Sequence, residues 1–205
     1  MSALRVYLAG PDVFYPDAVQ IGEAKKAICR KYGFEGRYPL DSLVGKPQWT
    51  TLKDSPIALA TWIYTEARTM LESCDIVVAN ITPFRGPAAD SGTVWEMGYA
   101  AGLGRPVHAY STDPRPYHNK VADAVKTPTG LRDSRGWLVE DFGMIDNVML
   151  DCSVQSSGGI LIAKSETEPL LVFSTLMAEL RRRHYHNKSG PPGRGSASAI
   201  DLTRD

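Results

Sequence analysis

The sequence predicts an α/β protein with a doubly wound parallel sheet and helices on both faces. Three short runs, residues 6–10, 75–81 and 106–110, have the apolar, partly β-branched content of buried strands. Helix-like segments, residues 17–33 and 56–74, separate the first two runs. Alternating strands and helices need crossover connections, whose right-handed sense places helices on both sides of the sheet. The expected architecture is therefore flavodoxin-like or Rossmann-like.

The first helix is predicted by apolar residues at helical spacing within residues 17–33. Asp17 is a candidate N-cap, and Gly33 stands where a helix-ending glycine is expected. Residues 36–41 indicate a brief extended segment. Residues 41–56 are polar and rich in turn formers, so we expect a loop there, over the site end of the fold.

The central part of the chain continues the alternation. A second helix is predicted over residues 56–74, because Pro56 suits the first turn of a helix. The strand at 75–81 follows, then a loop, a helix over about 92–104 and the strand at 106–110. This order supports the parallel sheet.

The later part of the chain is less regular. Residues 111–143 are mostly polar and carry no clear pattern. Residues 146–154 and 158–164 each predict a short strand, and 166–186 predict a helix with one apolar face. We expect one domain over residues 1–186 and a disordered, glycine-, serine- and proline-rich tail over 187–205.

Composition narrows the function classes. The chain has 23 Lys plus Arg and 23 Asp plus Glu, so its formal net charge is zero and no global basic field would attract nucleic acid. The longest apolar runs have the length of a strand, too short to cross a membrane. The chain has three widely spaced cysteines, Cys29, Cys74 and Cys152. Their odd number and spacing disfavour a disulfide framework or a zinc site and predict a cytoplasmic protein.

Loops that follow parallel strands meet at one edge of the sheet, where ligands bind. Here these loops are residues 9–14, 82–90 and 110–116. The first has one glycine followed by proline and lacks the GxGxxG pattern, so NAD binding is disfavoured. The sequence has no Walker motif either.

Two carboxylates lie close to this edge. Glu96 stands between Trp95 and Met97, in what we expect to be the first turn of its helix, where the helix dipole would keep it ionised. Asp90 precedes it by six residues, in the loop. Paired carboxylates on one pocket suit cleavage of a glycosidic bond. The alternative is an ordinary helical glutamate with a loop or capping aspartate.

Residues 79–107, ANITPFRGPAADSGTVWEMGYAAGLGRPV, closely resemble the signature of the nucleoside 2-deoxyribosyltransferase family. VYLAGPDVF at 6–14 and VEDFGMIDNVML at 139–150 agree with it, in the family's order. The resemblance covers about residues 5–150. It implies transfer of 2-deoxyribose between nucleobases through a covalent deoxyribosyl-glutamate intermediate, with retention and with no metal or organic cofactor.

The resemblance also implies residue roles. Glu96 matches the nucleophile, Tyr7 the tyrosine that orients it, and Asp90 the aspartate that holds the sugar hydroxyls at the 5′ end. Gly10, Pro11 and Phe14, in the loop after the first strand, would bind substrate, and Phe14 would lie against the base. Two of these residues have plain alternatives, since Tyr7 could be an ordinary strand residue and Phe14 a core residue.

Two further residues are implied to serve a neighbouring subunit. Asn147 and Met149 match residues that family members insert into the adjacent active site, so a homo-oligomer, dimer or higher, is expected. Asn147 could instead be a turn residue, and Met149 a core residue.

One position departs from the family pattern. Many members have an aspartate or asparagine that assists at the base, and the count back from Asp75 places Ala67 there, beside Glu66. Either Glu66 takes over, the alignment slips by one residue, or protonation of the leaving base is managed differently.

Two rival functions stay open. A nucleotide N-glycosidase of the same superfamily would pass the sugar to water, and it typically has serine in place of Asp90. An aspartate would repel a phosphate, although Ser91 is adjacent. A non-catalytic nucleoside-binding module is the second rival. Retention of Tyr7, Asp90 and Glu96 together favours the transferase, with nucleosides and nucleobases as its small-molecule partners.

Overall fold

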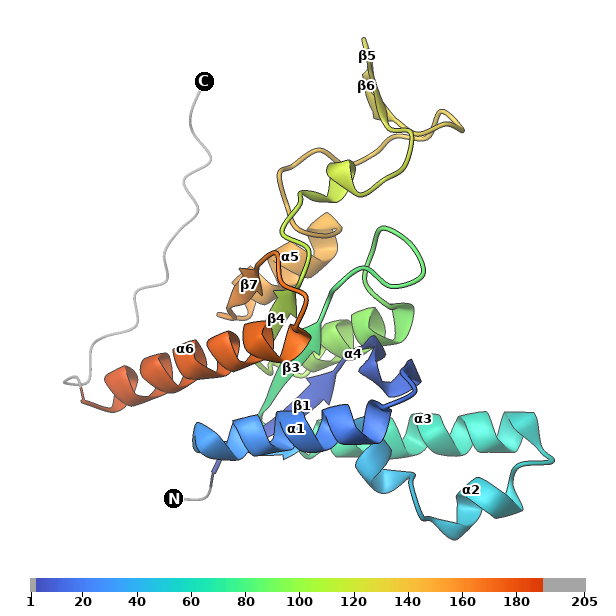
Figure 1. Ribbon diagram of the computed structural model, residues 1–205, viewed down its shortest axis with the longest axis vertical. Helices are drawn as coiled ribbons and strands as arrows, with labels where there is room; N and C mark the ends of the chain where they lie inside the picture. Colours follow the sequence, from blue (N-terminus) through green and yellow to red (C-terminus); the bar gives the residue numbers. More distant parts are fainter. Residues whose placement is uncertain (1–2, 190–205) are drawn as a thin grey trace.

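A five-stranded parallel sheet forms the centre of the protein (Figure 1). The computed structural model describes residues 3–189, with side chains to residue 184. The strands, in spatial order, are β2 (Glu35–Arg37), β1 (Arg5–Ala9), β3 (Ile76–Asn80), β4 (Val107–Ser111) and β7 (Leu161–Ala163). This is the flavodoxin-like order. From β1, the chain first adds β2 on one side and then continues with β3 on the other, so the topological switch point lies between β1 and β3. The predicted fold class is confirmed.

Helices cover both faces of the sheet. On one face lie α1 (Ala18–Lys31) and α6 (Pro169–Ser189); on the other lie α3 (Pro56–Glu72), α4 (Ser91–Gly102) and α5 (Val148–Ser156). The short helices are η1 (Pro11–Phe14), η2 (Pro39–Ser42), α2 (Pro47–Thr51) and η3 (Tyr117–Asn119). A hairpin of β5 (Val125–Thr127) and β6 (Gly130–Arg132) stands away from the sheet at the top of Figure 1.

Alternation along the strands divides the core into two halves. In β1, Val6 and Leu8 join the core beneath α1 and α6, whereas Tyr7 and Ala9 join the core beneath α3, α4 and α5. All four side chains are buried, as expected for a strand covered on both faces. The period of two therefore points Tyr7 toward α4.

The segment 146–154 is a helix, α5, and the predicted strand is wrong. The Asn147 side chain accepts a hydrogen bond from the backbone N–H of Met149 and so caps the helix. Leu150 and Val154, four residues apart, are its buried side chains. The apolar residues thus follow a helical period, which a nine-residue window with a polar start does not distinguish from a short strand.

Other boundaries differ in detail. The expected loop at 41–56 contains α2 and the end of η2, and each of these begins with a proline, a favourable first residue. The helix expected at 92–104 spans Ser91–Gly102. Gly33 has φ of 84°, as a helix-ending glycine requires. Of the expected tail, residues 187–189 continue α6 and 190–205 lie outside the described residues.

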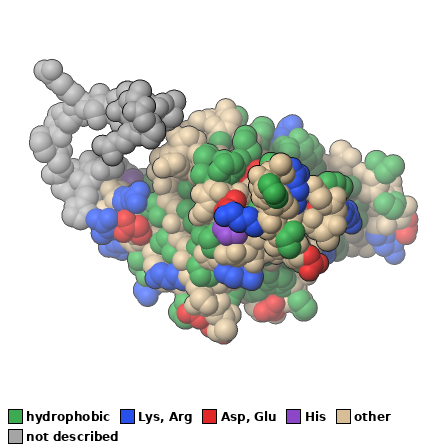
Figure 2. Space-filling view, turned by 90° about the horizontal axis from the view of Figure 1, so that it is seen from above, with side chains coloured by type: hydrophobic (Ala, Val, Ile, Leu, Met, Phe, Trp, Pro, Cys, Tyr) green, Lys and Arg blue, Asp and Glu red, His purple; other side chains and the backbone are tan. Residues whose placement is uncertain are grey.

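The surface of the described part mixes both charges. In the face drawn in Figure 2, cationic and anionic side chains are interspersed among apolar ones, without a broad patch of one sign. None of the helices in the described residues is both long enough and apolar enough to cross a membrane.

A buried ion pair joins the loop after β1 to α1. The Lys25 ammonium lies 2.5 Å from Asp12 Oδ2, and both side chains are at most 2% exposed. The Asn80 side chain donates to the same carboxylate, at 3.2 and 3.3 Å. Burial lowers the pKa of Lys25, and Asp12 opposes that shift. The pair therefore anchors the β1 loop against β3 and α1.

We expect Asp12→Ala to destabilise the protein by about 3–5 kcal/mol, because it leaves the buried ammonium of Lys25 without its counter-charge. Urea unfolding of both proteins measures the difference. Glu35→Ala is the control, since it removes an ion pair with Arg37 in which both side chains are more than 40% exposed. Equal midpoints for Asp12→Ala and the wild type would contradict the anchoring role.

Candidate active site

A cavity of about 370 Å³ opens at the carboxyl ends of β1 and β3. Ligands of doubly wound folds bind at this point of topological reversal. Gly10 and Phe14 line it from the loop after β1, and Asp90 and Glu96 from the start of α4. η2, α2 and α3 supply mostly apolar side chains: Leu40, Trp49, Ile63 and Ala67 among them. The sheet topology thus brings together segments that are far apart in the sequence.

Tyr7 and Glu96 meet beneath this cavity. Tyr7 is fully buried in β1, and its hydroxyl donates a hydrogen bond of 2.5 Å to Glu96 Oε1. The alternation of β1 points the tyrosine at α4, and the neighbouring Met97 fixes that helix in the same core. The structure therefore brings together two of the predicted site residues.

The expected reason for the charge of Glu96 is wrong. Glu96 is the sixth residue of α4, beyond the first turn to which the dipole effect is confined. Burial raises its pKa to about 7; the hydrogen bond from Tyr7 lowers it and the nearby charge of Asp90 raises it further. Near neutral pH, Glu96 is therefore poised between its protonated and ionised forms. Burial and Glu96 together raise the pKa of Tyr7 well above its ordinary value, so this tyrosine stays a donor.

Asp90 is the N-cap of α4 and also lines the cavity. Its Oδ2 accepts hydrogen bonds from Thr93, from the backbone N–H at 3.0 Å and from the hydroxyl at 3.2 Å. The capping alternative and the pocket location therefore both hold. Within the described chain no bond to Oδ1 is recorded, so this oxygen can accept from a ligand hydroxyl.

The loop after β1 passes very close to β3. Gly10 has φ of 155°, and a Cβ there would lie 2.5 Å from Asp12 Oδ2 and 2.8 Å from the Cβ of Asn80. Only glycine fits this approach. Pro11 is buried and begins η1, without lining the cavity. Phe14 is 55% exposed on the cavity, so it is not a core residue.

Two positions on the far wall bear on the sequence analysis. Ala67 lines the cavity, whereas Glu66 is not among the described lining residues, so the structure does not favour Glu66 as a replacement. Trp49 also lines the cavity, and sequence reasoning missed it. The only signal in the sequence was a tryptophan in a polar, turn-rich segment. That signal does not distinguish a residue of the cavity from an ordinary exposed residue.

Asn147 and Met149 lie outside the cavity of their own chain. Asn147 Nδ2 donates to Glu140 Oε1 at 2.8 Å while its Oδ1 caps α5, so the residue begins a helix rather than a turn. Met149 is 73% exposed and is not a core residue. Buried Asp146 accepts from the backbone N–H of Ala89 at 2.9 Å, and this bond ties the start of α5 to the loop before Asp90.

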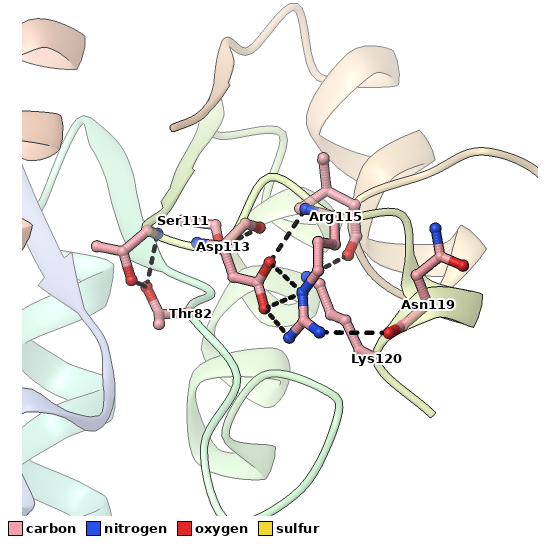
Figure 3. A network of polar contacts seen from close by, with 8 residues as sticks. Thr82, Ser111, Asp113, Arg115, Asn119 and Lys120 are labelled. Atoms are coloured by element: carbon pink, nitrogen blue, oxygen red, sulfur yellow. Dashed lines mark hydrogen bonds and ion pairs between the residues drawn. The ribbon is translucent and has the colours of Figure 1, made fainter. Parts of the chain in front are cut away.

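A polar network holds the connection from β4 to α5 (Figure 3). Thr82, just after β3, accepts from the backbone N–H of Thr112 at 3.1 Å. The Asp113 carboxylate accepts from the guanidinium of Arg115 at 2.6 to 3.1 Å. Lys120 donates to the carbonyl oxygen of Ile145 at 2.7 Å. The segment that leaves β4 is thereby fastened to the loop after β3 and to the segment that leads into α5.

Fold and site together define a flavodoxin-like α/β protein with a paired-carboxylate cavity at its topological switch point. Residues 6–149 match the model of the family described as nucleoside 2-deoxyribosyltransferase. The chain belongs to this family.

The chain is also similar to two individual proteins. The chain is 31% identical over 193 residues to an uncharacterized protein of Schizosaccharomyces pombe, a match that covers 87% of this chain and 89% of that protein. It is also similar to the solved structure of a 2-deoxyribosyltransferase from Leishmania mexicana, with 25% identity and a TM-score of 0.64. That match covers 88% of this chain and 99% of the other.

The raised pKa of Glu96 predicts a pH-dependent gain in stability for Glu96→Gln. Because the folded-state pKa of about 7 lies above the ordinary value of 4.5, the contribution of Glu96 to stability is present below about pH 4.5 and is lost as the pH rises through 7. The variant should therefore be more stable than the wild type at pH 8, by up to about 3 kcal/mol. Urea unfolding across this range tests it, and a difference independent of pH would refute the shifted pKa.

Proposed function

We propose that this protein transfers 2-deoxyribose between nucleobases by a retaining double displacement. The observation that carries the proposal is the hydrogen bond from Tyr7 to Glu96 at the cavity, because it presents an oriented carboxylate where a sugar can bind. Membership of the nucleoside 2-deoxyribosyltransferase family supports nucleosides as the substrate class. The similar structure from Leishmania mexicana, described as a 2-deoxyribosyltransferase, supports the same activity.

In the first step, the ionised Glu96 attacks C1′ of a 2′-deoxynucleoside. The C1′–N bond breaks, its electron pair goes to the base nitrogen, and a deoxyribosyl ester of Glu96 forms. A second base then attacks C1′ through a ring nitrogen, and the C1′–O bond of the ester breaks to release the carboxylate. The N–H proton of the incoming base passes to solvent, and the departing base takes up one proton from solvent, so the exchange balances. Two inversions give net retention, and each step is easier than a single direct exchange.

The other site residues take supporting roles in this proposal. Tyr7 donates to Oε1 and so leaves Oε2 to attack C1′. Asp90 accepts from a hydroxyl at the 5′ end of the sugar through Oδ1, while Gly10 and Phe14 border the base. Asn147 and Met149 would complete the cavity of a neighbouring subunit, to which the exposure of Met149 is suited. The protein's own carboxylates supply the chemistry, with no metal or organic cofactor.

A second candidate is hydrolysis, in which water takes the sugar from Glu96. The carboxylate of Asp90 on the cavity favours nucleosides over nucleotides in either reaction, because a phosphate dianion close to it would be repelled. A binding module without chemistry is the third candidate. A buried carboxylate with a pKa near 7 supports catalysis over simple binding.

The transfer is tested by incubating the protein with deoxyinosine and adenine, and separately with deoxyinosine alone. We expect deoxyadenosine and hypoxanthine in the first reaction. Free deoxyribose without deoxyadenosine would support hydrolysis, and no product would support the binding module. Glu96→Ala should reduce transfer by at least about a thousandfold, because it removes the nucleophile. Glu66→Ala is the control and should retain activity.

The hydrogen bond from Tyr7 to Glu96 predicts that removing it shifts the pH dependence of kcat/KM. In the wild type, kcat/KM should rise with pH through an apparent pKa near 7, because only ionised Glu96 attacks C1′. Tyr7→Phe removes a bond that lowers this pKa, so the rise should move to higher pH. The measurement is kcat/KM from about pH 5 to about pH 9 for both proteins. A slower variant with an unshifted profile would show that Tyr7 does not act on Glu96.

A further inference from the structure

The cavity differs in character between its two sides. Its polar side-chain groups on α4 come from Asp90, Thr93 and Glu96. The remaining lining is apolar apart from one indole. It comes mainly from η1, η2 and the residue after it, α2 and α3, and it includes Val13, Leu40, Leu43, Trp49, Ile63 and Ala67. A sugar with its hydroxyls and C1′ suits the carboxylate side, and a flat heterocycle suits the apolar side.

Two aromatic side chains face this cavity from separate elements. Phe14 belongs to η1 and is 55% exposed; Trp49 belongs to α2 and is 49% exposed. Half-exposed rings on the wall of one concave, mostly apolar cavity are typical of a ligand site. Within the described residues, the rings of Phe14 and Trp49 are not in contact with each other.

The two rings differ in how they are held. Phe14 is stacked on Phe84 at 5.6 Å, and the guanidinium of Arg85 lies 5.3 Å from the Phe14 ring. Among the described residues, Trp49 makes no ring contact and its indole N–H donates to no protein acceptor. Phe14 is therefore a braced wall, whereas Trp49 presents both its ring and its donor group to the cavity or solvent.

We propose that Trp49 is the second aromatic wall of the base site and determines its preference for purines over pyrimidines. This rests on the proposed function, which places a nucleobase in the cavity. Stacking and dispersion grow with the overlapping ring area, so a fused two-ring base gains more from the indole than a single ring does. The indole N–H adds a donor for a ring nitrogen or carbonyl of the base.

The direct test is binding of free bases to Glu96→Gln, in which no sugar transfer occurs. Indole fluorescence, excited in the red edge of the tryptophan band, is followed while adenine or cytosine is added. We expect quenching, with tighter binding of adenine, and loss of this quenching in Trp49→Phe. Trp137→Phe is the matched control, since Trp137 is also exposed but does not line the cavity. Quenching that survives in Trp49→Phe and disappears in Trp137→Phe would overturn the proposal.

Steady-state kinetics give the second measurement. Trp49→Ala should raise KM for purine deoxynucleosides at least about fivefold, a lower bound for the loss of one stacked base. It should raise KM less for pyrimidine deoxynucleosides, and Trp49→Phe should recover most of the loss. Equal KM values for wild type and Trp49→Ala on both base classes would overturn the proposal while leaving the transferase function intact.

The two proposals fail in different ways. If adenine binds in a Trp49-dependent manner but no deoxynucleoside is converted, the base site stands and the proposed transfer falls. If transfer occurs and binding does not depend on Trp49, the transfer stands and the assignment of Trp49 falls. The side chains of α2 are exposed, so substitution of Trp49 should leave the sheet folded and the Tyr7–Glu96 hydrogen bond in place. Circular dichroism of Trp49→Ala checks that the fold is kept.

Discussion

The hydrogen bond between Tyr7 and Glu96 is the contact on which the rest of the site depends. It joins strand β1, the neighbour of the central strand β3, to helix α4, so the position of the carboxylate is set by a buried part of the sheet. A carboxylate in this environment has its pKa raised by loss of water, and the tyrosine opposes that shift. The same bond thus fixes where Glu96 lies and how readily it ionises, which are the two properties a carboxylate nucleophile needs.

A second buried interaction supports another wall of the cavity, the loop after β1. The Asp12–Lys25 ion pair fastens the loop after β1 to α1, and Gly10 allows that loop to approach β3 closely. Neither side chain of the pair lines the cavity. The ion pair and the Tyr7 bond therefore act on different walls, one on the loop that carries Phe14 and the other on the helix that carries Glu96. Rigid walls of this kind reduce the ordering that substrate binding must impose.

Much of this arrangement could be predicted from the sequence because it follows local rules. Strand periodicity and parallel topology place the loop with Gly10 near Asp90 and Glu96, and a long, specific motif indicates the family. Other features depend on contacts between distant segments. The pKa of Glu96 follows from the burial of its side chain in the folded protein, and the role of Asp12 requires Lys25 on another element.

The helix at 146–154 and the position of Trp49 show two further limits of prediction. In α5, the side chain of Asn147 decides the outcome by capping a short segment whose apolar residues fit either period. Trp49 lies on a five-residue helix in a turn-rich stretch, where local pattern does not say which surface a side chain meets. Only the path of the whole segment from η2 to α3 brings that indole to the cavity.

The link between the cavity and α5 has a consequence for an oligomer. Asp146 accepts from the N–H of Ala89, next to Asp90, and from the N–H of Asn147, the residue expected to serve a neighbouring subunit. The buried carboxylate of Asp146 therefore connects the loop before Asp90 to the start of α5, the segment that the proposal places in a neighbouring subunit's cavity. Burial raises the pKa of Asp146, and its two backbone donors oppose this, so the connection is held by hydrogen bonds in the interior. In the proposed oligomer, the same buried carboxylate would therefore support both the loop before Asp90 and the residue that enters the neighbouring cavity.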